Sequence, residues 1–125
     1  MKLTRYIIKK QIKLITKYIN KEKKLGKRSI IYKSTSDLCR KSPIKIDYSR
    51  DILNNIYFIY DPIEKHWGET DGKSIGLNTY KEFNSDTLYY TILHEYLHGM
   101  IYRNNTYMSE YLEHRVMLLI DKNLI

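Results

Sequence analysis

Two histidines and a glutamate within residues 90–102 have the spacing of a catalytic metal site. His94 and His98 are four residues apart, and on a helix that spacing puts both imidazoles on one face, one turn apart. Such a pair can reach one Zn²⁺ ion at about 2.0–2.1 Å. Glu95 is rotated by about 100° from His94, so it can face a metal-bound water without being a ligand. The pattern therefore predicts a hydrolytic zinc site.

The residues around the motif favour a helix with one buried face. Apolar side chains recur there in two rows of i, i+4 spacing: Leu88, Ile92, Tyr96 and Met100 form one row, and Tyr89, Leu93, Leu97 and Ile101 form the next. Tyr90, His94, His98 and Tyr102 form a separate row beside them. The histidines are thus predicted to stand at the edge of the buried face, where the floor of a cleft would lie.

Three further residues fit this helix. Ser85 is the predicted N-cap, and Asp86 suits the first turn. Gly99 follows Glu95 by one turn, and its missing side chain leaves room for another segment to approach closely.

A catalytic zinc needs a third protein ligand and one open position. Residues 108–120 are predicted to form a second helix after the polar turn at residues 103–106. Glu110 and His114 share a face of that helix, and Glu113 lies near it. We expect Glu110 to be the ligand and His114 to orient a ligand. Glu113 or His114 as the direct ligand is the alternative.

These two segments resemble those of a known group of enzymes. The pattern His94-Glu95-x-x-His98, followed by Glu110-Tyr111-x-x-His114, resembles the gluzincin clan of zinc metallopeptidases. In that clan the third ligand is a glutamate on a following "glutamate helix", usually within Glu-x-x-x-Asp. Here Glu110 matches that ligand, His114 stands in place of the aspartate, and the linker is shorter than in most relatives.

The length of the chain indicates a smaller group of proteins within this clan. Over roughly residues 70 to 120 it is similar to the minigluzincins, soluble archaeal proteins that resemble the catalytic domains of integral-membrane metallopeptidases. The resemblance implies a zinc-dependent peptidase in which Glu95 is the general base. It also implies a minimal zincin fold, and it permits synthesis as a latent zymogen, since some gluzincins are made as zymogens.

The 125 residues predict a single α+β domain spanning residues 1–125. We expect an N-terminal helix, a small twisted mixed sheet of three to four strands, the active-site helix and the glutamate helix. The sequence contains neither an apolar run of 18 residues nor a secretory signal, which excludes a membrane span and predicts a cytoplasmic protein. A single cysteine, Cys39, excludes an internal disulfide and argues against a thiolate zinc site.

The positive charge of the chain, whose net charge is +8, is concentrated in one segment. Residues 1–28 hold eleven basic residues and one acidic residue, Glu22, whereas the rest of the chain has a net charge of −2. Residues 2–25 have helical apolar spacing, and Gly26 is a plausible C-cap. The segment is predicted to be a helix that backs the sheet. The alternatives are a latency segment over the cleft, or a contact with nucleic acid or a membrane surface.

Three segments in the first half of the chain are predicted to be strands: residues 29–32, 44–48 and 56–60. The last, Ile56 to Tyr60, is continuously apolar, which favours a central position. Residues 34–39 suit a short helical turn, residues 51–55 a turn, and residues 64–73 a polar loop.

Residues 74–78 are predicted to be a strand just before the active-site helix. In zincins the edge strand beside that helix forms the upper rim of the cleft. Ile75, Gly76 and Leu77 are therefore candidates for a substrate rim, where an extended peptide would add as a further strand.

Other residues are weaker candidates for the site. His66 lies in the polar loop, where it could stabilise a transition state, although a surface role is the more ordinary one for a loop histidine. Tyr102 and Tyr107 lie near the metal motifs, and a phenol can donate a hydrogen bond to an oxyanion.

Two other functions compete with the peptidase. One is a DNA-associated metallopeptidase resembling the SprT-like proteins, which use a histidine as third ligand, so that His114 would replace Glu110. The other is a zinc-binding regulatory module without catalysis.

Overall fold

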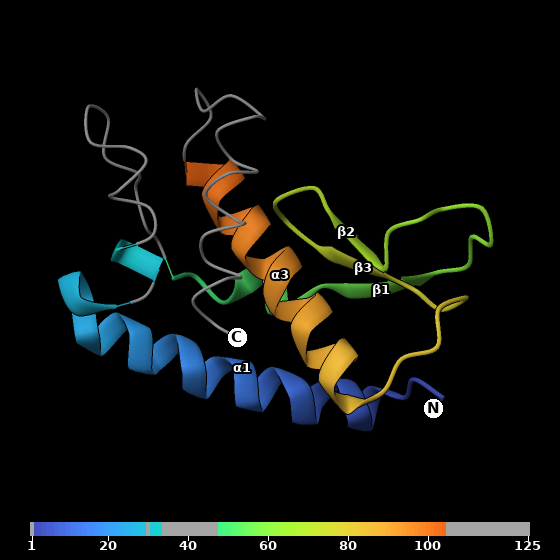
Figure 1. Cartoon of the computed structure of the whole chain (residues 1–125), viewed down its shortest axis with the longest axis horizontal. Helices are drawn as coiled ribbons and strands as arrows, with labels where there is room; N and C mark the ends of the chain where they lie inside the picture. The colour runs from blue at the N-terminus through green and yellow to red at the C-terminus, as the bar shows by residue number, and fades with distance from the viewer. Residues whose placement is uncertain (1, 30, 34–47, 105–125) are drawn as a thin grey trace.

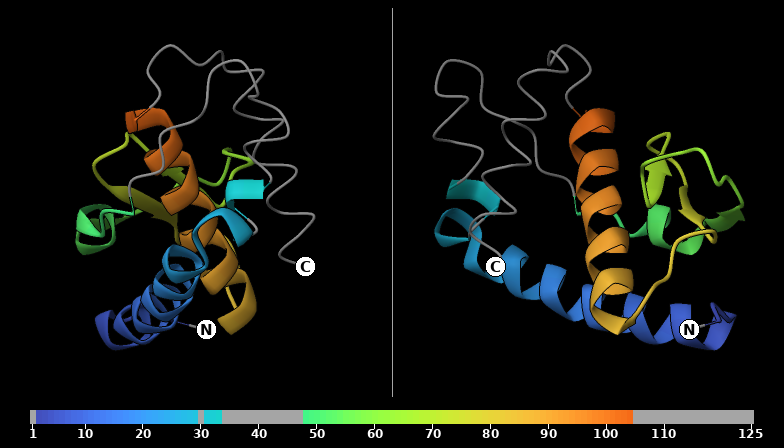
Figure 2. Two further views of the ribbon diagram at one scale, coloured as in Figure 1. Left: turned by 90° about the vertical axis from the view of Figure 1, so that its left-hand side faces the viewer. Right: turned by 45° about the vertical axis from the view of Figure 1, so that its right-hand side comes forward.

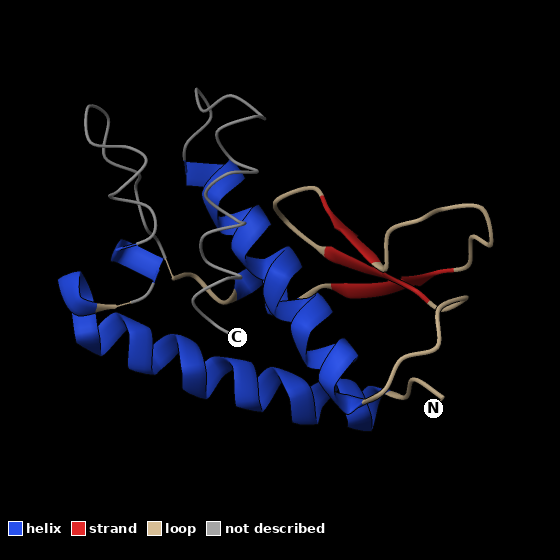
Figure 3. Cartoon of the chain, viewed as in Figure 1, coloured by secondary structure: helices blue, strands red, loops and turns tan. Residues whose placement is uncertain are grey.

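The computed structural model describes residues 2–29, 31–33 and 48–104. Two long helices, α1 (Arg5–Leu25) and α3 (Ser85–Asn104), lie beside a small mixed sheet. In Figure 1, α1 runs along one border of the molecule and α3 rises steeply from it, with the strands beside α3. The same layering is seen from two other sides in Figure 2 and by element type in Figure 3. The α+β class, the N-terminal helix and the small mixed sheet are confirmed.

Helix α1 ends where the sequence predicts, but it begins at Arg5, three residues after the predicted start at residue 2. The Thr4 hydroxyl accepts a hydrogen bond from the Ile7 N–H at 3.2 Å, which satisfies one of the unpaired donors of the first turn. Gly26 ends the helix with φ at 55°, a backbone conformation that glycine adopts without a Cβ penalty. Ile8, Ile15 and Ile19 are buried along its inner face.

The strand predicted at residues 29–32 is wrong, because residues 31–33 are helical. The Ser29 hydroxyl accepts a hydrogen bond from the Tyr32 N–H at 3.0 Å, and the Ser29 carbonyl accepts one from the Lys33 N–H at 3.1 Å. Serine can cap a helical turn in this way, and the apolar Ile31 is buried from a helix instead of a strand.

Two short 3₁₀ helices complete the described helical segments. They are η1 (Gly26–Arg28), directly after α1, and η2 (Asp51–Asn54), where a turn was expected. The predicted turn at residues 34–39 lies outside the described residues, as does most of the strand predicted at 44–48. Tyr48 is described and is not in a strand.

The sheet has the order β1-β3-β2, formed by β1 (Ile56–Ile59), β2 (Gly68–Thr70) and β3 (Ile75–Asn78). β1 and β3 are parallel, with Ile56 opposite Ile75, whereas β2 is antiparallel to β3, with Glu69 opposite Gly76. Of the described strands, β3 is therefore the central one.

The central position predicted for residues 56–60 is wrong. β1 is an outer strand of the described sheet, and Tyr57 and Phe58 are 38% and 46% exposed. The Tyr57 ring covers Gly76, where a Cβ atom would meet it at 2.7 Å, and its hydroxyl donates to the Glu69 carboxylate at 2.8 Å. The aromatic residues of β1 thus cover the surface of the sheet instead of filling its core.

Helix α3 begins one residue earlier than expected. Asn84, not Ser85, is the cap: its side-chain oxygen accepts a hydrogen bond from the Thr87 N–H at 2.9 Å. In return, the Thr87 hydroxyl accepts one from the Asn84 N–H at 2.8 Å. This reciprocal pair satisfies donors on both sides of the first turn. Asp86 lies in the first turn, as predicted.

The apolar face predicted for α3 forms the core. One predicted row is at most 1% exposed along its whole length: Leu88, Ile92, Tyr96 and Met100. Leu93 and Leu97 of the second row are also buried, and Tyr89 is partly buried. This face joins one cluster with the inner face of α1, with η2 and with β3. Neither α1 nor α3, nor any other helix in the described ranges, has the length and apolar character of a bilayer span.

We predict that Asn84→Ala destabilises the protein by about 1 kcal/mol, because it removes the cap of α3. Chemical denaturation followed by circular dichroism would measure the change. Ser85→Ala is the matched control, since its neighbour provides the cap, and it should change the free energy of unfolding by less than about 0.5 kcal/mol. Equal effects of the two substitutions would contradict the assignment.

Candidate metal and catalytic site

Tyr90, His94 and His98 form one continuous row along α3, as the sequence predicts. The ring centroids of Tyr90 and His94 are 5.6 Å apart, and those of His94 and His98 are 4.6 Å apart. Both histidines are partly exposed, whereas the neighbouring Leu93 and Leu97 are buried. The two imidazoles therefore lie together at the edge of the core face, at a spacing that suits two ligands of one metal ion.

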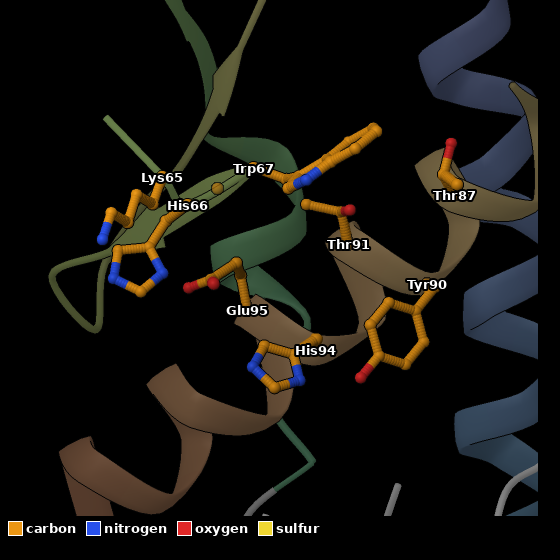
Figure 4. A pocket seen from close by; sticks show the side chains of 9 residues that line it. Lys65, His66, Trp67, Thr87, Tyr90, Thr91, His94 and Glu95 are labelled. Atoms are coloured by element: carbon orange, nitrogen blue, oxygen red, sulfur yellow. The ribbon is translucent and has the colours of Figure 1, made fainter. Parts of the chain in front are cut away.

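Glu95 lies on the adjacent side of α3, in a pocket of about 360 Å³. The pocket is lined from three directions: by α3, by the first residue of β2 and by the loop before β2. Its residues are Lys65, His66, Trp67, Gly68, Thr87, Tyr90, Thr91, His94 and Glu95. Figure 4 shows the Glu95 carboxylate extending toward the His66 ring, with His94 and Tyr90 side by side on the same helix.

Strand β2 approaches α3 so closely that a side chain at either of two glycines would crowd its neighbours. A Cβ atom on Gly68 would lie 2.9 Å from Thr91 Cγ2 and 3.1 Å from Glu95 Cγ. One turn beyond Glu95, a Cβ atom on Gly99 would lie 3.0 Å from Ile52 Cδ1 and 3.1 Å from Thr70 Oγ1. The close approach expected at Gly99 is confirmed. Together the two contacts set the strand directly against the helix that carries the histidines.

Burial under this strand alters the acidity of Glu95. Desolvation raises the pKa of the Glu95 carboxyl above its ordinary value, and Glu69 acts in the same direction. His98, His94 and His66 oppose that shift in pKa but do not outweigh it. A carboxylate with a raised pKa is a stronger base than one in water, which is the property that general-base catalysis at neutral pH needs.

The outer edge of β2 is open within the described sheet. The Asn78 N–H donates to the Trp67 carbonyl at 2.9 Å, so Glu69 and Gly76 form the next hydrogen-bonded pair of the antiparallel ladder. The backbone groups of Gly68 and Thr70 consequently point away from β3. An extended peptide could pair with them, beside Glu95.

The expectation that Ile75, Gly76 and Leu77 form this rim is wrong. They lie in β3, which pairs with β1 on one side and β2 on the other, and all three are buried. The edge strand is β2, from the segment 64–73 that was expected to be a loop. A three-residue strand containing a glycine has too little apolar alternation to be recognised, and its pairing depends on β3.

The loop before β2 supplies residues that the sequence did not mark clearly. The side chain of His66 is 83% exposed and lies 3.9 Å from Glu64, yet it also lines the pocket. Trp67 packs edge-on against the buried Phe83 at 5.1 Å, which holds the loop to the core. A lone tryptophan beside a glycine was the available signal, and it does not specify a pocket by itself.

The expected third ligand, Glu110, lies outside the described residues, as do Glu113, His114 and Tyr107. Tyr102 is described for its backbone alone. Within residues 2–29, 31–33 and 48–104, no three His, Cys, Asp or Glu side chains come together as a metal site. The described part of the site is thus the histidine pair, with Glu95 on the next face.

Helix α1 packs behind α3 and does not cover the pocket. Of the described residues 2–28, none lines the pocket beside Glu95, whereas Ile8, Ile15 and Ile19 belong to the core cluster. The helix that was expected to back the sheet thus packs mainly against α3 among the described elements.

Comparisons of this chain with protein-family models, with curated proteins and with solved structures find no match.

We predict that Glu95→Gln stabilises the metal-free protein at neutral pH. A carboxyl whose pKa is raised on folding contributes stability below its unfolded pKa, and that contribution is lost as pH rises through the folded pKa. Glutamine removes the cost of burying the charge. The melting temperature of the variant minus that of the unmodified protein should therefore increase as the pH rises from about 4 to about 7.

Thermal melts in chelator across this pH range would measure the difference. Glu82→Gln, which removes an exposed carboxylate, controls for the change in net charge. A difference between Glu95→Gln and the unmodified protein that stays constant with pH would contradict the burial of this charge.

Proposed function

We propose that the chain is a zinc-dependent peptidase of the gluzincin type with a minimal zincin fold. The observation that carries the proposal is the histidine pair on one face of α3, with rings 4.6 Å apart, next to a glutamate that lines a pocket. That arrangement places one candidate ligand, His94, in the same pocket as the candidate base Glu95, and the second candidate ligand, His98, lies one turn along the helix. The raised pKa of Glu95 gives further support, because it suits a proton acceptor.

In this proposal His94, His98 and Glu110 hold Zn²⁺. When bound, zinc polarises the scissile carbonyl and lowers the pKa of its coordinated water toward about 7. Glu95 takes a proton from the attacking water and later delivers it to the leaving amine. Gly68 lies against the Glu95 side chain, since a Cβ atom there would be 3.1 Å from Glu95 Cγ, and the carboxylate lines the pocket.

The substrate is proposed to bind as an added strand. The outward backbone groups of Gly68 and Thr70 pair with an extended peptide, which then crosses the pocket above Glu95. The open edge of β2 thus takes the role that the sequence suggested for residues 75–77. An extended main chain is what peptides offer in common, so this mode fits a peptidase better than an enzyme acting on small molecules.

We predict that Glu95→Gln retains zinc but loses cleavage by about 10²- to 10⁴-fold, the usual contribution of a general base. Elemental analysis would give the zinc content, and a quenched-fluorescence peptide library, with and without a chelator, would give the activity. Glu82→Gln serves as the matched control and should retain both.

His94→Ala and His98→Ala should each lose the metal. Chelator-sensitive cleavage by the unmodified protein would reject a regulatory module without catalysis. Undiminished cleavage by Glu95→Gln would refute the role of Glu95 as base, and the absence of bound zinc in folded protein would refute the proposal as a whole.

The third ligand separates the gluzincin assignment from the SprT-like alternative. We predict that Glu110→Ala abolishes zinc binding, because two imidazoles alone leave the site incomplete. His114→Ala should retain zinc, with affinity reduced about 10- to 100-fold, as expected for a group that orients a ligand. Zinc titration against a fluorescent competitor would measure both. The reverse outcome would favour a histidine ligand and the SprT-like alternative.

A further inference from the structure

We propose that the outward face of α1 binds the phosphate backbone of nucleic acid. Five lysines form a ridge along this face, spaced by three or four residues: Lys10, Lys13, Lys17, Lys21 and Lys24. All five are exposed. At 1.5 Å per residue the ridge is about 21 Å long, the length over which a duplex carries roughly twelve phosphate charges.

The ridge is uniformly positive because the one acidic residue of the segment is turned inward. Glu22 is 2% exposed, and its carboxylate accepts a hydrogen bond from the Tyr18 hydroxyl at 2.6 Å. A glutamate on the outer face could neutralise a neighbouring lysine one turn away. With Glu22 buried, no carboxylate of residues 2–28 competes with a bound phosphate for the lysines.

An open hollow lies over the outer face of α1. Its described lining residues all belong to α1 and η1, and four ridge lysines, Arg28 and Tyr18 are among them. Tyr6, on the outer face one turn before Lys10, is 77% exposed. Cationic grooves with nearby aromatic rings are the pattern by which proteins follow a single strand, with phosphates on the cations and bases stacked on the rings.

The packing of α1 disfavours a membrane as the partner. An interfacial helix must insert its apolar face into the lipid, but Ile8, Ile15 and Ile19 are held in the core by α3 and its neighbours. On the outer face, Tyr6 and Leu14 are the large apolar residues left exposed among those described. Charge without an apolar face that can insert suits a polyanion in water.

The test is binding of a labelled 20-nucleotide single strand and a 20-base-pair duplex, followed by fluorescence anisotropy. Chelator is present throughout, so the outcome does not depend on zinc or peptidase activity. If five lysines contact phosphates, affinity should fall roughly 100- to 500-fold between 50 and 200 mM salt.

The decisive comparison is between two variants of equal net charge. Lys13→Gln/Lys17→Gln/Lys24→Gln removes three ridge lysines, whereas Lys33→Gln/Lys73→Gln/Lys81→Gln removes three lysines elsewhere. The ridge variant should bind at least ~10-fold more weakly at low salt, with a slope of log affinity against log salt that is less steep by about 2 to 3. The control should bind like the unmodified protein. Circular dichroism would verify that both variants are folded.

Three outcomes would overturn the proposal: no binding at 50 mM salt, equal weakening by both variants, or tighter binding to vesicles containing 30% phosphatidylserine than to either nucleic acid. The last would identify the partner as a membrane surface.

Discussion

The rotation of α3 about its own axis is the constraint on which the rest of the structure depends. A full row of its side chains is nearly inaccessible to water, and Leu93 and Leu97 are buried beside it. Each such side chain contributes roughly 1.5–3 kcal/mol through burial, so turning the helix by even one residue position would cost several of these contributions. Because the core fixes the rotation, His94 and His98 must lie at the boundary between core and solvent, and Glu95 must face the sheet.

The second constraint is the contact between β2 and α3. Gly68 and Gly99 allow the strand to lie against the helix at a distance that side chains would not permit. This contact removes water from around the Glu95 side chain, and the loss of hydration raises the pKa of its carboxyl. One short strand thus lines the pocket, alters the acidity of the candidate base and presents an open backbone edge beside it.

Helix α1 has two faces with different roles. Its inner face completes the core under α3, and its Tyr18–Glu22 hydrogen bond keeps the segment's one carboxylate out of solvent. Its outer face is left with lysines. The charge of +10 carried by residues 1–28 is therefore concentrated on a surface that does not line the pocket, so that a polyanion on α1 and a peptide at β2 would contact different parts of the molecule.

The sequence by itself determined the two long helices, since their patterns are local. The 3.6-residue repeat at residues 88–100 identified both the core face and the row of His94 and His98, and Gly26 marked the end of α1. What only the tertiary structure decided was strand order. The aromatic run at residues 56–59 resembled a central strand, but it pairs at the edge of the described sheet, where the Tyr57 ring covers Gly76. The strand from Gly68 to Thr70 has only three residues, which are too few to show a periodic pattern in the sequence, so its pairing with β3 could not be predicted. The order of strands in a sheet depends on contacts between residues that are distant in the chain. A helix, in contrast, depends on contacts within one turn. The sequence could therefore place the histidines on one face, whereas the pocket beside Glu95 and its open edge depended on the assembled sheet.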